Sequence, residues 1–65
     1  MYTAMEQMHN GELTGFMLEA ETKEDITEQL ANIVTEKTSW FVTDLETKNE
    51  YFFNEKSENL EQIWN

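Results

Sequence analysis

Carboxylates are the side chains of this sequence that could most evidently take part in chemistry. Asp44, Glu46 and Glu50 occupy the first, third and seventh positions of a twelve-residue window that Glu55 closes. Oxygen ligands at these positions hold the metal ion in an EF-hand calcium loop. The spacing therefore raises the hypothesis of an acidic metal-binding module.

Two residues of the same window argue against a calcium loop. Lys48 occupies a position where a ligand is needed, and Asn49 replaces the glycine that the sharp turn of the loop requires. The sequence EYFF at residues 50–53 is typical of a strand. We therefore expect no metal ion and no other cofactor.

Residues that could support enzymatic catalysis are scarce. His9 is the only histidine, and it stands beside a predicted turn, where a lone imidazole is usually solvated. No serine lies in a nucleophile-elbow motif, and no glycine-rich phosphate loop is present. A chain of 65 residues also leaves little room for a concave pocket. We expect no enzymatic activity.

The charge balance is strongly acidic. Fourteen aspartate and glutamate residues face four lysines, and the net charge is −10. Such a field repels polyanions, which disfavours direct binding to nucleic acid or to an anionic membrane surface. The same field attracts basic protein surfaces and speeds encounters with them.

Length and composition indicate one small domain spanning residues 1–65. There is no cysteine, so neither a disulfide framework nor a thiolate metal site is expected. No apolar run approaches the roughly 18 residues that span a bilayer, and the first residues do not resemble a secretory signal. A cytoplasmic location is the expectation.

The first third of the chain predicts a β-hairpin. Residues 2–8 and 13–21 are expected to form strands around Asn10-Gly11, because both residues tolerate the positive φ of a type I′ turn. Apolar and polar residues alternate in the second strand, which places Phe16 on its apolar face. The pattern of the first strand would also suit a short helix.

Residues 22–37 carry the clearest helical pattern. Thr22 is suited to cap the N-terminus, and Lys37 is expected where a cation complements the C-terminal end of the helix dipole. The helix should pack through one apolar stripe, formed by Ile26, Leu30, Ile33 and Val34.

Five aromatic residues lie between residues 38 and 54, in a predicted second hairpin. Its strands, at residues 39–45 and 50–54, are joined by a turn through residues 47–49. Loop length leaves the register open, and a one-residue shift exchanges the two faces. In either register both faces carry apolar groups, so one face can pack on the helix and the other needs a second cover.

The C-terminal segment could supply that cover. Residues 57–64 (SENLEQIW) are expected to form a short helix capped by Ser57, with Leu60, Ile63 and Trp64 along one side. If this segment does not fold back, the uncovered face becomes an association site. The predicted fold is an α+β domain, β-β-α-β-β, with a small antiparallel sheet, one amphipathic helix packed on it and a short C-terminal helix.

The positions of the acidic residues are as informative as their number. Glu24 and Glu28 lie nearly opposite the apolar stripe of the helix, and such an i, i+4 pair costs about 0.2–0.5 kcal/mol. Keeping like charges together suggests that the negative field is used. DNA carries one phosphate per about 1.7 Å of duplex axis, so rows of carboxylates on a rigid scaffold can imitate its potential.

The sequence therefore favours a non-enzymatic acidic protein that docks on a basic surface of a protein partner and competes there with nucleic acid. Trp40 and Tyr51 are expected to add an apolar anchor. The residues expected to supply the field are Glu24, Asp25, Glu28, Asp44, Glu46 and Glu50. The alternative is a structural protein that self-associates, as a homodimer, through its aromatic hairpin and the methionine-containing first strand.

In size and acidity the chain resembles the small host-takeover and DNA-mimic inhibitors that phages encode. The resemblance is one of class, and no residue motif accompanies it. It implies an inhibitor of a nucleic-acid-binding protein, and it carries no functional residues over to this sequence.

Overall fold

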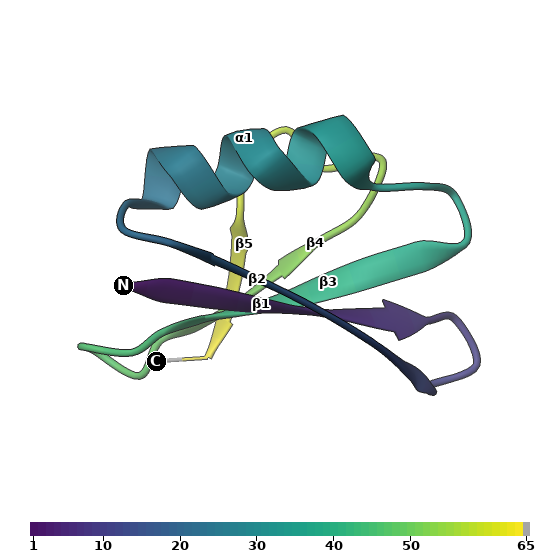
Figure 1. Cartoon of the computed structure of the whole chain (residues 1–65), viewed down its shortest axis with the longest axis horizontal. Helices are drawn as coiled ribbons and strands as arrows, with labels where there is room; N and C mark the ends of the chain where they lie inside the picture. The colour runs from purple at the N-terminus through teal and green to yellow at the C-terminus, as the bar shows by residue number, and fades with distance from the viewer. Residues whose placement is uncertain (65) are drawn as a thin grey trace.

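The computed structural model, which describes the backbone of residues 1–64 and the side chains of residues 1–63, contains two strands, one helix and then three strands along the chain. The elements are β1 (Tyr2–Met8), β2 (Leu13–Ala20), α1 (Lys23–Ile33), β3 (Thr38–Asp44), β4 (Glu50–Phe53) and β5 (Glu61–Trp64). The strands form one antiparallel sheet in the order β2-β1-β3-β4-β5 (Figure 1). The α+β class and the order of the first five elements are as the sequence predicts.

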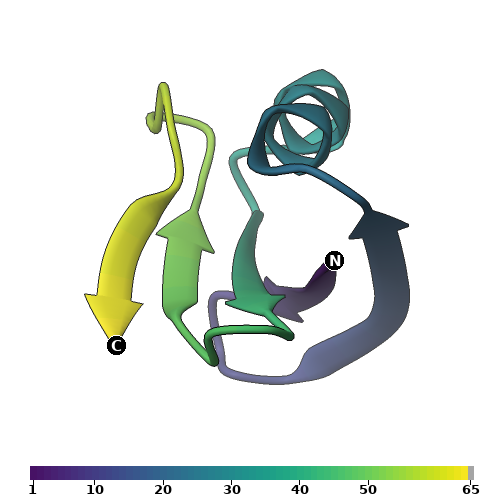
Figure 2. The same ribbon diagram turned by 90° about the vertical axis from the view of Figure 1, so that its left-hand side faces the viewer.

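The first strand lies inside the sheet. β1 pairs antiparallel with β2 on one side and with β3 on the other, so β2 and β3 run parallel to each other with β1 between them. Parallel strands require a long crossover connection, and α1 provides it. The helix consequently lies across one face of the sheet, where it contacts β1 and β2 (Figure 2).

The helix begins where the sequence predicts. The Thr22 hydroxyl accepts a hydrogen bond from the backbone N–H of Asp25 at 3.1 Å, which satisfies one of the free donors of the first turn. Ile26 and Leu30 are fully buried against the sheet. The helix stops at Ile33, four residues short of the predicted end, because the chain turns extended at the next residue to enter β3.

Two parts of the helix prediction are therefore wrong. Ile33 is 42% exposed because it occupies the last helical position and does not continue the buried stripe. Lys37 lies in the connection to β3, so the last helical turn carries no basic residue. Val34 caps the helix, and its backbone N–H still bonds to the carbonyl of Leu30 at 2.9 Å.

The turn between β1 and β2 differs from the predicted type I′ turn. Gly11 alone adopts a positive φ (+94°), and its N–H donates to the carbonyl of Met8 at 2.9 Å. Asn10 does not adopt a positive φ, and its side-chain oxygen accepts a hydrogen bond from the N–H of Glu12 at 3.0 Å. The turn is a three-residue loop closed by a glycine in the left-handed region.

The C-terminal segment is a strand, and the predicted C-terminal helix is wrong. β5 pairs with the edge of β4 that would otherwise be unpaired. Ser57 does not cap a helix; it closes the turn after β4, where its N–H donates to the carbonyl of Asn54 at 3.0 Å. The segment thus extends the sheet sideways and does not fold back across its second face. Trp64 lies in β5, and its side chain is outside the described residues.

The aromatic residues of the second hairpin divide between the two faces of the sheet. Trp40, Tyr51 and Phe53 are buried on the side of α1. Phe41 and Phe52 lie on the opposite side, because successive side chains of a strand alternate. The complete core consists of Ala4, Ile26, Leu30, Trp40, Val42, Tyr51, Phe53 and Leu60.

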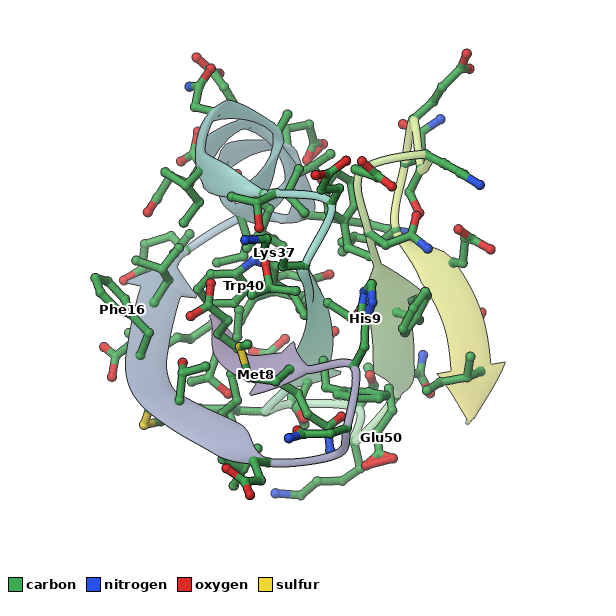
Figure 3. All side chains as sticks on the ribbon, turned by 90° about the vertical axis from the view of Figure 1, so that its right-hand side faces the viewer. Met8, His9, Phe16, Lys37, Trp40 and Glu50 are labelled. Atoms are coloured by element: carbon green, nitrogen blue, oxygen red, sulfur yellow. The ribbon has the colours of Figure 1, made fainter. Side chains whose placement is uncertain are left out.

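Phe16 does not join this core. It is 61% exposed and projects outward from β2, away from the body of the protein (Figure 3). β2 is irregular at this point: Gly15 has a positive φ of +88°, and the pairing of β1 with β2 shifts between Met5 and Gln7. Phe16 therefore lies within an irregular stretch of β2, where the regular alternation of faces is interrupted.

Candidate functional site

Two of the predicted carboxylates line an open cleft. Glu24 and Glu28 lie along α1 at the rim of a cleft of about 510 Å³. The opposite wall is the chain before β5, at Asn59 and the buried Leu60. The lining of this cleft therefore combines apolar side chains, Ala31 and Leu60, with the carboxylates of α1. A partner could insert a side chain with an aliphatic stem and a cationic head.

A lysine of the chain itself, Lys23, also lines this cleft. The ammonium group of Lys23 lies 4.8 Å from the centre of the Tyr51 ring, within cation–π distance. The Tyr51 ring also packs against Tyr2, with 6.4 Å between ring centres. These contacts join the first turn of α1 to β4 and β1. They were not foreseen from the sequence, because they depend on which strand lies under the helix.

Asp44 serves the structure of the hairpin. It is only 8% exposed, and its carboxylate accepts a hydrogen bond from the backbone N–H of Glu46 at 3.0 Å. This hydrogen bond lowers the pKa of Asp44, and the side chains of Thr47 and Tyr2 act in the same direction. Asp44 therefore carries its charge at neutral pH, with the carboxylate directed into the turn.

The acidic residues at the start of the helix and at the hairpin meet at one end of the molecule. Burial raises the pKa of the Tyr2 phenol, and the carboxylates of Asp44 and Glu24 raise it further. One tyrosine thus lies near both groups. In Figure 1 the start of α1 and the β3–β4 turn lie at the same end. We call Glu24, Asp25, Glu28 and Glu46 the acidic end; Asp44 is not counted, because its carboxylate is directed into its own turn.

The remaining predicted site residues lie elsewhere. Glu50 begins β4 on the face of the sheet opposite α1, and Figure 3 shows it on the side away from the helix. Trp40 lies between α1 and the sheet and is 1% exposed. Tyr51 is 5% exposed. Both aromatic rings therefore stabilise the core and are not offered to a partner as an anchor.

A pH experiment tests the role of Asp44. Because its folded-state pKa is lowered below 3.8, its contribution to stability is complete above that value and disappears as the pH falls through the folded-state pKa. Asp44→Asn keeps the oxygen acceptor but cannot titrate. We expect the melting temperature of the wild type to exceed that of Asp44→Asn at pH 7, and the gap to close on acidification to about pH 2.

The control for this experiment is Asp44→Ala, which removes the acceptor as well as the charge. It should melt below Asp44→Asn at every pH, because the N–H of Glu46 then loses its partner. A gap between wild type and Asp44→Asn that stayed constant from neutral to acidic pH would contradict the assignment.

The calcium-loop interpretation is wrong. The window from Asp44 to Glu55 contains the β3–β4 turn and the whole of β4, so its carboxylates do not converge on one point. Within residues 1–64, no three histidine, cysteine or carboxylate side chains gather closely enough to hold a metal ion. In the same part of the chain, no helix is long and apolar enough to cross a bilayer.

A second cleft, of about 520 Å³, lies at the opposite end of the molecule. His9 and Lys37 stand at its edges, with Glu36 and Glu55 (Figure 3). These side chains come from the β1–β2 turn, the α1–β3 connection and the β4–β5 connection. Their charges are mixed, so the cleft does not extend the acidic end.

Comparison with known proteins provides no relative. No protein-family model, curated protein or solved structure matches this chain. The functional conclusion rests on the geometry of the chain itself.

Proposed function

We propose that this chain is a non-enzymatic acidic binding protein that docks on a basic surface of a protein partner. The observation that carries the proposal is the cleft beside α1, whose rim carries Glu24 and Glu28 and whose wall includes Leu60. Lysine and arginine side chains have the length, the aliphatic stem and the charge to enter such a cleft.

The partner that fits best is a nucleic-acid-binding protein. Its basic groove is shaped to contact rows of phosphates, and the carboxylates of the acidic end would occupy the same positions. Binding would then exclude nucleic acid from the groove, so the protein would act as an inhibitor of the DNA-mimic kind. The net charge of −10 would speed the encounter.

The experiment is affinity capture with two variants of equal charge. Glu24→Lys with Glu28→Lys reverses the rim of the cleft, whereas Glu12→Lys with Glu58→Lys makes the same charge change at exposed positions that do not line it. Wild type and the second variant should capture the same basic protein from a lysate of the source organism, released as salt rises. The first variant should lose it, with affinity lowered by about tenfold or more.

Both variants must be shown to be folded by circular dichroism before capture. If Glu24→Lys with Glu28→Lys captured the same protein as wild type, at the same salt, the proposed use of the acidic end would be refuted.

Self-association through the aromatic hairpin is the second candidate function. One observation favours it: Phe41 and Phe52 stack edge to face across β3 and β4, with 5.6 Å between ring centres, on the face opposite α1. Phe41 is 39% exposed in the isolated chain. A second copy could cover this pair.

A further inference from the structure

The sheet face opposite α1 carries a continuous row of apolar side chains. Met17 lies opposite Met5, Met5 opposite Phe41, and Phe41 opposite Phe52 in the strand pairings. These four side chains, from β2, β1, β3 and β4, form what we call the apolar row. Met17 is 57% exposed, Met5 37% and Phe41 39%.

No other element of the described chain covers this row. The helix α1 lies on the opposite face (Figures 1 and 2), and β5 continues the sheet at its edge. Soluble proteins keep contiguous exposed apolar surface small, and larger patches commonly mark interaction sites. Methionine and aromatic side chains are also the types enriched in protein interfaces.

Carboxylates stand at both ends of the row. Glu19 lies two residues from Met17 on the same face of β2. At the other end, Glu61 of β5 faces Phe52, and Glu50 lies two residues from Phe52 along β4. All three glutamates are exposed. The surface is therefore apolar in the middle and negative at each end.

This arrangement disfavours a second copy of the chain as the occupant. Two such faces can align their apolar rows in either direction, but carboxylates meet carboxylates at the ends in both. Each copy also brings a net charge of −10. Like charges brought together at an interface lower the affinity of the two surfaces. Basic groups of a partner at the same positions would instead be attracted to the carboxylates.

We propose that the apolar row docks an amphipathic helix of a protein partner, with lysine or arginine at each end of its apolar stripe. The row spans four strands, a distance of about 14 Å for a strand spacing of about 4.8 Å. A helix of about 10 residues covers that length and presents apolar side chains at i, i+3, i+4 and i+7. The inference rests on the proposed function in one respect, namely that the partner is basic.

The test uses a synthetic probe. A peptide of about 12 residues carries leucine at the i, i+3, i+4 and i+7 positions and lysine elsewhere; a control peptide has the same composition in scrambled order. Each is titrated at low salt into the full ¹⁵N-labelled chain, and amide shifts are followed by NMR. We expect the amphipathic peptide to shift amides of β1, β2, β3 and β4 around the row and to bind more tightly than its scrambled control.

Three variants of the chain test whether the peptide binds at the apolar row. Phe41→Thr and Met17→Thr keep a residue suited to strands but shorten the row, and each should weaken the amphipathic peptide by about tenfold. Phe16→Thr is the matched control: Phe16 is 61% exposed on β2 but outside the row, so its removal should leave affinity unchanged. All three positions are exposed, which favours retention of the fold.

The outcomes separate this inference from the proposed function. Suppose that both peptides bound with equal affinity, and that only the double variant Glu24→Lys with Glu28→Lys weakened their binding. The apolar row would then be refuted as a binding site, and the acidic end would remain the proposed one. If neither peptide bound, this inference would be overturned, and the proposed function would be judged by the affinity capture alone. If the wild type sedimented as a dimer that Phe41→Thr dissociated, the occupant would be a second copy and the inference would be overturned.

Discussion

Trp40→Ala is expected to abolish most of the stability of this protein. The indole is 1% exposed between α1 and the sheet, and replacing such a ring by alanine costs about 3–5 kcal/mol. A domain of this length has a total free energy of unfolding of about 3–10 kcal/mol. Urea unfolding followed by circular dichroism should show a large loss of folded protein in the absence of denaturant.

The neighbouring residue provides the matched control. Phe41 belongs to the same strand but faces the other way, and it is 39% exposed. Phe41→Ala should cost clearly less than Trp40→Ala. Trp40→Phe should stay folded, because it keeps a ring in the core and removes an indole N–H that is buried with no acceptor among the described residues. Equal losses for Trp40→Ala and Phe41→Ala would contradict the assignment of the two faces.

Leu30→Ala carries the second large expected effect. Leu30 is fully buried where α1 meets the sheet, so its truncation should cost about 2–5 kcal/mol. Ile33→Ala, three residues later on the same helix, should cost less than about 1.5 kcal/mol, because Ile33 is 42% exposed. Thermal unfolding of the two variants under identical conditions measures the difference. A greater loss for Ile33→Ala would mean that the helix packs through another face.

Local signals of the sequence predicted α1 and its cap well. Thr22 accepts the expected backbone hydrogen bond, and Ile26 and Leu30 are the two residues of the expected stripe that are fully buried. Such features depend on residues within one or two turns of each other, which the sequence displays directly. The end of the helix was less predictable, because it depends on where the chain must leave to reach β3.

The C-terminal segment shows why a short apolar pattern is ambiguous. Leu60, Ile63 and Trp64 have helical spacing, yet residues 61–64 form a strand. A stretch this short fits either period, and the decision comes from the neighbouring edge of β4, which offers backbone groups to pair with. This edge exists only in the folded sheet, so the sequence of the segment alone does not reveal it.

The sequence predicted which residue types the candidate site contains, but not how these residues are arranged on the surface. The sequence shows that Glu24 and Glu28 share a helix face, and they line one cleft. The sequence does not show that the carboxylate of Asp44 accepts a hydrogen bond within its own turn, because that contact depends on the turn geometry. The apolar row draws one residue from each of four strands, so predicting it required the strand order and register.

The central position of β1 has a consequence for how the chain folds. β1 is synthesised before the other four described strands, yet one of its two neighbours, β3, is made only after β2 and α1. Tyr2 pairs with Asp44, so this ladder closes a long loop and should form late. Until then the early hairpin has an open edge and an uncovered apolar face, the state in which a nascent chain is most exposed to aggregation.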